Sequence, residues 1–543
     1  GAQRPGEGAK TMSELKKCTG TQAVVSSARI EASRIAIDIL KKGGNVVDAA
    51  VAVGFALGVC EPSTSGLGGG GFMLLRLADQ TEPVFLDFRE TAPRKASENM
   101  WRRNPAGRVA DHENAIGGKS IGVPGEAAGL FYALHHYGTM DKASVINPAA
   151  ELADSGFTVT PMMESHFKKG EPFLKKYEGS RRVYSDENII RAGRICRNPE
   201  LAAVLRSLAS HPDDWFYTGE LADRMIADIR KDGGVMTKED LEHFVPVLRA
   251  PVQGTYRGYR IYSSNLPSSG GTHIIQMLNI LENFEVGALK VNSAEYLHLF
   301  SEAFKKVYAD RAGYMADADF YEVPVRGLTD KAYARHIAAG ISLERCSPVS
   351  VEDPWQYEHP DTTHYSIGDS RGNLVSVTKT INHFCGSCLV PEGTGFLLND
   401  TLADFSTAAG DINAVAPLKK PLSTMSPTII LKDGKPFAVL GSPGGERIIC
   451  TMVQVISKLI DHGMDIAEAI ASPRMTENTK NKIVYESRMA PAEISRAEQL
   501  GHRMEQVLPY DIKMGGMQGV VYLPDGTMEG SADPRRDGVA LGY

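Results

Sequence analysis

The apolar residues near the start of the chain predict two consecutive helices. The first, over 27–42, carries apolar side chains at helical spacing and ends at the Gly43-Gly44 pair. Asn45 can cap the second helix, with Asp48 as its third residue, where the helix dipole favours a carboxylate. Because the body of this second helix is rich in alanine, valine and glycine, we expect it to be buried on all sides.

Apolar runs further along the chain predict strands. Residues 72–77 and 84–88 are expected to pair, and 363–443 alternates short strands with turns. Much of 125–310 has helical periodicity, and the last strong helix is expected at 448–460. Strands with helices on both flanks predict a layered α+β protein.

Composition narrows the range of partners. The 543 residues contain no low-complexity or Pro/Ser-rich linker, so one large globular unit is expected. The formal charge is 59 − 66 = −7 without acidic or basic blocks, which disfavours nucleic acid and anionic membranes as partners. The longest apolar stretch, 49–60, has twelve residues, fewer than the ~18 that a membrane span needs. A small molecule or a peptide is therefore the expected substrate.

The cysteines and histidines do not indicate a metal or redox centre. Seven cysteines, an odd number, leave at least one thiol unpaired within the chain. Cys385 and Cys388 have metal or redox spacing, but no second such pair exists, so a local disulfide or two plain thiols are favoured. The histidines are scattered without ligand spacing. We expect neither a metal nor an organic cofactor.

Residues 1–8 contain no apolar signal core, which fits either a mature end after signal removal or a remnant of expression. An extracellular or periplasmic location is expected, and a cytoplasmic one stays open.

The segment Asp361-Thr362-Thr363-His364, with Thr380-Ile381-Asn382 eighteen residues later, has two interpretations. The first is an ordinary strand, since 362–367 is β-prone and Gly372-Asn373 can form a turn. The second is that cleavage before Thr362 frees an α-amino group, with a pKa near ~8, which accepts the threonine's own hydroxyl proton. One residue would then be both nucleophile and base. His364 supports the strand and is not expected to be the base.

Other segments on both sides of this threonine decide between these interpretations by their order and spacing. They are 43–53, 66–73, 87–90, 122–125, 397–400, 404–406, Pro421-Leu422-Ser423-Thr424-Met425-Ser426-Pro427-Thr428, Gly441-Ser442-Pro443-Gly444-Gly445 and Asp533-Pro534-Arg535-Arg536. Together they resemble γ-glutamyltranspeptidases, and the resemblance spans about residues 20 to 543. The glycines of 66–71 are assigned to close packing, because the lysine of a phosphate-binding loop is absent.

The resemblance implies the four-layer αββα sandwich of the N-terminal-nucleophile hydrolases. It also implies that the precursor cuts itself between Asp361 and Thr362. The products would be a large subunit of residues 1–361 and a small subunit of residues 362–543, associated as a heterodimer within one globular fold.

The resemblance also assigns the chemistry. The Thr362 hydroxyl would attack a γ-glutamyl donor such as glutathione, and water or the amine of an amino acid or peptide would take the acyl group from the resulting ester. Thr380 would hydrogen-bond the nucleophile, unless it is an ordinary strand threonine. Gly444 and Gly445 would supply amides for the oxyanion, unless they form only a tight turn.

Recognition of the donor is implied at its two charged groups. Arg89 would bind the α-carboxylate with the hydroxyls of Ser423 and Thr424, while Asp404 and Asn382 would hold the α-ammonium. The alternative for Arg89 and Asp404 is a structural ion pair.

Two positions depart from the family pattern. Thr424 stands where a second serine is common, which keeps a donor but adds a methyl group. Thr401 replaces a glutamine or glutamate near the donor's amino group and is shorter, so recognition of the ammonium would be weaker or bridged by water.

The loop 407–420 is short and has no aromatic residue, whereas several relatives carry a longer lid there. We therefore expect an open cleft that admits larger γ-glutamyl peptides or poly-γ-glutamate. Two rival functions remain. One is an acylase of the same fold acting on glutaryl-type side chains, which lack the ammonium, and the other is a non-catalytic, precursor-like binding protein.

Overall fold

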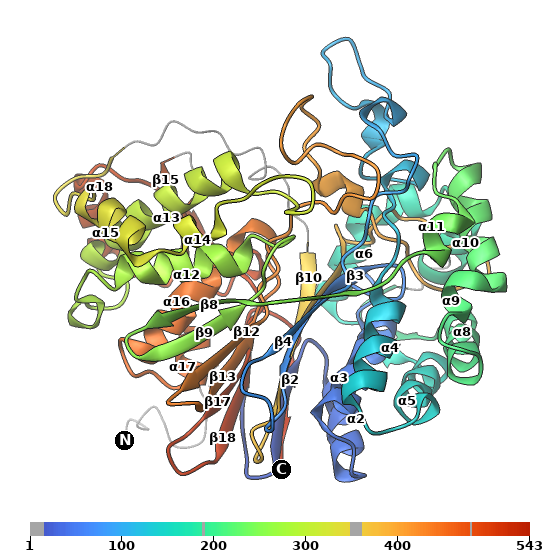
Figure 1. The fold of residues 1–543 in the computed structure, drawn as a ribbon, viewed down its shortest axis with the longest axis horizontal. Coiled ribbons are helices and arrows are strands. Elements are labelled where there is room, and N and C mark those ends of the chain that lie inside the picture. The colour runs from blue at the N-terminus through green and yellow to red at the C-terminus, as the bar shows by residue number, and fades with distance from the viewer. Residues whose placement is uncertain (1–15, 187–189, 348–360, 478–480) are drawn as a thin grey trace, which may run out of the picture.

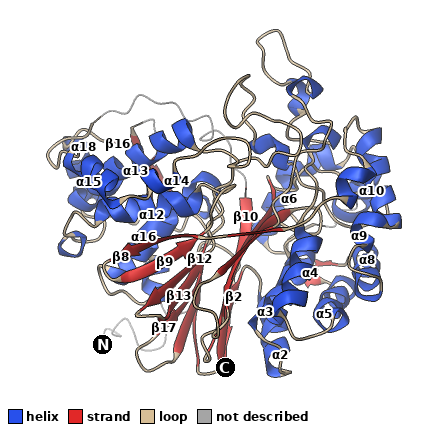
Figure 2. Ribbon diagram, in the orientation of Figure 1, coloured by secondary structure: helices blue, strands red, loops and turns tan. Residues whose placement is uncertain are grey.

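Two seven-stranded sheets lie face to face at the centre of the protein, and helices cover the outer side of each (Figures 1 and 2). The computed structural model describes residues 16–186, 190–347, 361–477 and 481–543. Helices, sheet, sheet and helices form four layers. The predicted α+β fold class, an αββα sandwich, is therefore confirmed.

Both central sheets are built from antiparallel neighbours. The first runs in the order β1 (Lys17–Gly20), β18 (Met528–Ala532), β17 (Gln518–Tyr522), β13 (Lys435–Gly441), β12 (Thr428–Lys432), β9 (Tyr259–Ser263) and β8 (Val252–Tyr256). The second runs in the order β19 (Val539–Gly542), β2 (Ala23–Ser27), β10 (Asp361–Asp369), β11 (Leu374–Asn382), β3 (Gly70–Arg76), β4 (Val84–Asp87) and β7 (Val247–Arg249). Each sheet thus combines strands from before and after Asp361.

Two smaller sheets lie outside this sandwich. They are β14 (Met475–Glu477), β15 (Lys482–Glu486) and β16 (Arg503–Val507), and the pair β5 (Phe157–Thr158) and β6 (Ile195–Cys196).

The helices divide into two groups by the sheet that they cover (Figure 1). Beside the second sheet lie α2 (Ile30–Lys41), α3 (Val46–Cys60), α4 (Glu126–Tyr137), α5 (Lys142–Ser155), α6 (Pro161–Leu174), α7 (Glu178–Ser180), α8 (Pro199–Ser210), α9 (Trp215–Thr218), α10 (Glu220–Lys231) and α11 (Lys238–Glu242). Beside the first lie α12 (Gly270–Leu281), α13 (Ala294–Tyr314), α14 (Val325–Leu328), α15 (Lys331–Ala339), α16 (Ile448–Ile460), α17 (Ile466–Ala471) and α18 (Pro491–Gln499). Within the described residues, none of these helices is long and apolar enough to cross a membrane.

Three apolar clusters hold the layers together. The cluster between the sheets joins side chains of both, including Phe72, Leu374, Val439 and Val520. The two others join each sheet to its helices. Burying such side chains stabilises the fold by roughly 25 cal/mol for each Å² of apolar surface removed from water.

Several predicted elements are confirmed. Asn45 and Asp48 form a capping box at the start of α3, and nearly all of α3 is buried. Strands β3 and β4 pair, and α16 has the predicted bounds. Much of 125–310 is helical, as predicted, but 247–263 forms strands: β7 and β8 are edge strands of the two sheets, and β9 lies next to β8. Pro251 and Gly258 punctuate this segment in the sequence and were the available signal.

A close approach of backbones fixes the strand that carries Thr380. Gly68 and Gly69 lie against the chain so tightly that a Cβ on Gly69 would be 2.1 Å from the Thr380 carbonyl oxygen. Only glycine fits such a contact. The glycine run over 66–71 therefore packs beside the site, as predicted.

Candidate active site

Asp361 and Thr362 begin strand β10 at the point where its pairing with β11 is irregular. Asp361 is opposite Asn382 and Thr363 is opposite Lys379, so β11 has one more residue than β10 in this interval. Such a bulge re-aims side chains locally. The Thr362 side chain lies at this irregularity and is buried, with the residue 5% exposed.

Thr380 and Arg536 hold the Asp361 side of the peptide bond between Asp361 and Thr362. The Thr380 hydroxyl donates to the Asp361 carbonyl oxygen at 2.6 Å and accepts the Asn382 amide at 2.7 Å. The Asp361 carboxylate accepts two hydrogen bonds from Nη1 of Arg536, at 2.8 and 2.9 Å, and one from the Thr362 amide at 2.9 Å. Thr380 thus contacts the carbonyl of this bond rather than the nucleophile's hydroxyl.

The Thr362 hydroxyl makes no hydrogen bond with any residue that the structure describes. Its oxygen is therefore not tied up by a structural contact.

Gly444 and Gly445 form the turn between β13 and α16. Their φ angles are 137° and 59°, a region that favours glycine. Neither amide donates a hydrogen bond within the described part of the chain, so both can receive an oxyanion. The Thr424 hydroxyl donates to the Gly445 carbonyl at 2.6 Å, which helps to fix this turn.

A pocket of about 420 Å³, including space open to solvent, brings most of the predicted site residues together. Its lining comprises Arg89, Arg311, Thr362, Thr380, Asn382, Asp404, Leu422, Ser423, Thr424, Met425, Gly445 and Glu446. These residues come from seven separate stretches of the chain, on both sides of Asp361.

Arg89 and Asp404 form a buried ion pair in this pocket, with Nη2 and Oδ2 2.9 Å apart. Backbone carbonyls orient the guanidinium, since Nε donates to Pro421 at 2.9 Å and Nη2 to Leu422 at 3.2 Å. The structural ion pair considered for these residues therefore exists. The pair also places a positive and a negative side chain next to each other in the pocket that Thr362 lines. A ligand that carries one negative and one positive group would match this arrangement of charges.

A family model described as Gamma-glutamyltranspeptidase matches residues 32–543. The chain belongs to the γ-glutamyltranspeptidase family. It is 40% identical over 539 residues to a glutathione hydrolase proenzyme of Escherichia coli (strain K12), covering 96% of this chain and 92% of the relative. It is 36% identical over 534 residues to an acylase ACY 1 proenzyme of Pseudomonas sp. (strain V22), covering 97% and 95%.

Solved structures show the same fold. The crystal structure of cephalosporin acylase from Bacillus halodurans aligns over 100% of this chain and 98% of that chain, with a TM-score of 0.89 and 26% identity. Membership in the family and the N-terminal-nucleophile fold are thus established by independent comparisons.

Thr401 is one of the positions where the sequence departs from the family pattern. Among the residues that the structure describes, those lining the pocket do not include Thr401. Its hydroxyl contacts the Glu90 carboxylate instead. Burial raises the pKa of Glu90 to about 7. The Thr401 side chain therefore acts on a buried acid behind the pocket, and its contribution to ammonium recognition stays a prediction.

Arg311 and Glu446 line the pocket but were missed in the sequence. Arg311 lies on α13, is 2% exposed, and donates from Nε to the Ser269 hydroxyl at 3.0 Å. A positively charged residue near the end of a helix with many apolar residues was the sequence feature that could have drawn attention to Arg311. The sequence could not show that Arg311 lies near Thr362, because this depends on how α13 packs against α12.

A second cavity, of about 1450 Å³ including space open to solvent, lies on the other side of the Asp361–Thr362 bond. Asp361 and Gly444 line this cavity, whereas Thr362 and Gly445 line the first. Its wall carries four cationic side chains and several apolar ones: Lys169, Arg447, Lys513 and Arg536, with Ile116, Phe173, Phe384 and Ile512. The peptide bond before Thr362 thus separates two cavities.

His364 and the cysteine pair have structural surroundings. The His364 ring lies between the hydroxyls of Thr378 and Ser366, each at 2.8 Å, and burial lowers its pKa to about 3. Cys385 and Cys388 are thiols, and burial raises the pKa of each. His364 is therefore a neutral strand residue and the two thiols are unreactive.

Replacing Thr380 by valine is expected to slow cleavage before Thr362 by roughly 10²–10³-fold, the effect of removing one oxyanion donor. Valine keeps the shape but removes the hydroxyl that contacts the Asp361 carbonyl. The measurement is a time course of intact mass after purification. Thr378→Val is the matched control, because its hydroxyl lies on the same strand and bonds His364 instead. Equal rates in the two variants would refute the role of Thr380.

Proposed function

We propose that this protein cleaves itself before Thr362 and then transfers the γ-glutamyl group of glutathione and related donors to water or to an amine. The observation that carries the proposal is that Thr362 shares one pocket with the Arg89–Asp404 pair. The nucleophile and a zwitterion-binding group therefore lie side by side. The relatives named glutathione hydrolase proenzyme support this activity.

Self-cleavage follows from the contacts of the bond. The Thr362 oxygen attacks the Asp361 carbonyl carbon, and the Thr380 hydroxyl stabilises the charge that develops on the carbonyl oxygen. The hydroxyl proton passes to the Thr362 nitrogen as the C–N bond breaks, which leaves an ester. Water then hydrolyses the ester, giving a carboxyl group on Asp361 and a free amine on Thr362.

The two pieces, 1–361 and 362–543, are proposed to remain one body after cleavage. In the second sheet, β10 and β11 of the small piece pair with β2 and β3 of the large piece. In the first sheet, β12 likewise pairs with β9. Separating the pieces would expose both sheets and the cluster between them.

In the cleaved protein the Thr362 amine accepts the hydroxyl proton while the oxygen attacks the donor's γ-carbonyl carbon. The amides of Gly444 and Gly445 stabilise the oxyanion. The leaving amine takes the proton, and an acyl ester remains on Thr362. Water or an acceptor amine then attacks this ester and restores the free threonine.

The α-carboxylate and α-ammonium of the donor fit the ion pair. Both groups sit on one carbon of the γ-glutamyl group, so a carboxylate facing Arg89 brings the ammonium next to Asp404. Charge-assisted hydrogen bonds of this kind are stronger than neutral ones. Ser423 and Asn382 also line the pocket and supply polar groups beside the pair.

The second cavity is our proposed place for the leaving group and the acceptor. Departure of Asp361 removes the carboxylate that Arg536 binds in the uncut chain. Arg536 would then face the space beside the Thr362 amine. Three further cationic side chains, Lys169, Arg447 and Lys513, line the same cavity. This favours acceptors and leaving groups that carry carboxylates, including γ-glutamyl peptides and poly-γ-glutamate.

The loop 407–420 supports an open donor pocket. None of its residues lines the pocket among those described. Asn413 holds the loop back, because its amide donates to the Asp404 carbonyl at 2.9 Å and its oxygen accepts the Leu422 amide at 3.1 Å.

A glutaryl-type acylase is the second candidate, since a relative named acylase ACY 1 proenzyme is 36% identical. The buried Asp404 carboxylate favours the first candidate, because a glutaryl donor has no ammonium to offset it. A non-catalytic precursor is disfavoured by the contact between Thr380 and the Asp361 carbonyl.

The test is to incubate the purified protein with glutathione, a γ-glutamyl anilide and the matching glutaryl anilide, each with and without a dipeptide acceptor. We expect release from both γ-glutamyl donors, faster with the acceptor, and at least ~10-fold less from the glutaryl anilide, corresponding to ~1.4 kcal/mol. A preference for the glutaryl anilide would establish the acylase instead. Cleaved protein with no turnover of any donor would contradict both.

A further inference from the structure

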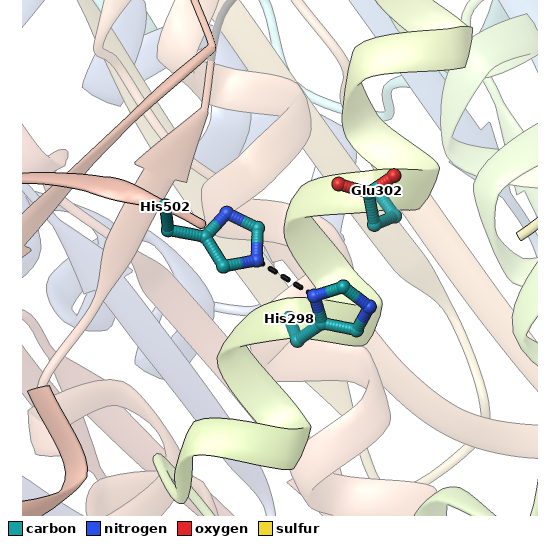
Figure 3. A group of neighbouring side chains, drawn as sticks. All are labelled: His298, Glu302 and His502. Atoms are coloured by element: carbon teal, nitrogen blue, oxygen red, sulfur yellow. Dashed lines mark hydrogen bonds between the residues drawn. The ribbon is translucent and has the colours of Figure 1, made fainter. Parts of the chain in front are cut away.

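A buried group of two histidines and a glutamate lies outside the active site (Figure 3). His298 and Glu302 are four residues apart on α13, so they share one face of this helix. His502 comes from the residue before β16 and faces them. One ligand atom of each residue lies within 4.8 Å of the others.

The hydrogen bonds of His298 present its ring as a ligand. Its Nε2 donates to the Ser342 carbonyl at 2.6 Å, which leaves the lone pair on Nδ1. A ring nitrogen fixed by a backbone carbonyl, with the other nitrogen turned toward a ligand cluster, is typical of metal-binding histidines. The Nδ1 atom faces Nε2 of His502 at 2.7 Å.

Both rings lie away from water, with His298 1% and His502 6% exposed. The group therefore lies inside the protein, where its ligand atoms face one another and not solvent.

Glu302 completes the group and ties it to the chain before the cleavage site. Its carboxylate accepts the Ser347 amide at 3.1 and 3.3 Å and pairs with Lys305 at 2.6 Å. Lys305 also donates to the Ser347 carbonyl at 2.7 Å. The Lys305 ammonium is the positive charge nearest to Glu302 that a bound metal ion would have to tolerate. Because Lys305 also donates to the Ser347 carbonyl, it can keep that hydrogen bond while one Glu302 oxygen turns to the metal.

We propose that His298, Glu302 and His502 bind one divalent ion of the zinc class. Nδ1 of His298, Nε2 of His502 and one Glu302 oxygen would be the protein ligands, with water in the fourth position. Binding requires the other neutral tautomer of His502, so the proton that Nε2 donates to His298 moves, by exchange with solvent, to Nδ1 of the same ring. The two nitrogens must move from 2.7 Å to roughly 3.3 Å apart, the separation for a tetrahedral ion with bonds of about 2.0–2.1 Å.

The bound ion would clamp three parts of the molecule: α13, the turn before β16 and the segment 342–347. That segment is held at Ser342, at Ser347 and by a hydrogen bond from the Cys346 amide to the Leu500 carbonyl at 2.9 Å. This segment precedes the proposed cleavage site in the sequence.

The four-residue spacing of His298 and Glu302 is visible in the sequence, but the third residue of the group, His502, is 204 residues from His298. The fold brings the third ligand to the helix pair.

The test uses untagged full-length protein freed of metal with a chelator and titrated with Zn²⁺ by calorimetry. Co²⁺ titration then reports the ligands through its visible absorption. We expect one equivalent to bind, tetrahedral Co²⁺ absorption and a higher unfolding temperature. His502→Gln and Glu302→Gln should each weaken binding at least ~10-fold, a loss like that seen on disturbing metal sites.

His336→Gln is the matched control, because His336 is an exposed histidine on α15. It should bind Zn²⁺ as the unaltered protein does. Absence of binding by the unaltered protein would overturn the proposal, as would equal affinity in all variants. Circular dichroism shows whether a variant has folded, and the Co²⁺ spectrum of the unaltered protein decides the question if one has not.

Discussion

Thr362→Ala is expected to remain a single chain of 543 residues, whereas the unaltered protein separates on denaturation into pieces of 361 and 543 − 361 = 182 residues. Alanine removes the oxygen that attacks the Asp361 carbonyl and, in the cleaved protein, the donor. Activity should fall by about 10⁴-fold or more, since loss of a nucleophile removes the covalent route. Denatured intact mass over time, with sequencing of the new N-terminus, measures the first effect.

Thr363→Ala is the matched control for this experiment. Thr363 is the neighbouring buried threonine, 1% exposed, and it does not line the pocket among the described residues. This variant should be cleaved and active. A cut in Thr362→Ala, or a failure of the unaltered protein to cut after prolonged incubation, would contradict the N-terminal-nucleophile mechanism.

The second large effect concerns the Arg89–Asp404 pair. Asp404→Asn removes the charge that faces the donor's ammonium and should lower kcat/KM for a γ-glutamyl donor by roughly 10–150-fold. That range corresponds to about 1.5–3 kcal/mol for a charge-assisted hydrogen bond. A glutaryl donor lacks the ammonium, so its kcat/KM should change little. Rates for matched γ-glutamyl and glutaryl anilides give this comparison directly.

Arg89→Lys should reduce the rates for both donors, because each carries a carboxylate and lysine lacks the planar fork of the guanidinium. Asp240→Asn is the matched control, since Asp240 is a buried carboxylate that pairs with the partly exposed Arg94 at 3.2 Å and does not line the pocket among the described residues. It should alter stability but not donor preference. Equal losses for both donors in Asp404→Asn would show that the pair is structural.

The local elements were well predicted where neighbouring residues determine them. The capping box of Asn45 and Asp48, the pairing of β3 with β4 and the bounds of α16 all depend on residues close in sequence. Of the strands missed within 247–263, β7 and β9 pair with the distant strands β4 and β12, whereas β8 and β9 form a local hairpin that Gly258 could have indicated.

The candidate site was predicted through family resemblance, and the structure gathers most of its residues in one pocket. Thr401 was placed there too, yet its side chain turns to Glu90. Thr380 and Thr424 were predicted to contact the nucleophile and the donor, whereas they bond the Asp361 and Gly445 carbonyls. The direction in which a short hydroxyl points depends on the local backbone, which residue types alone do not specify.

The sequence by itself determined the family, the layered fold and the position of the threonine, because these depend on ordered motifs and local periodicity. The tertiary structure alone decided how the Asp361–Thr362 bond separates two cavities, how Arg311 reaches the pocket and how His502 meets His298. These contacts join residues far apart in the chain. They depend on the packing of sheets and helices, which brings together side chains whose spacing in sequence carries no signal.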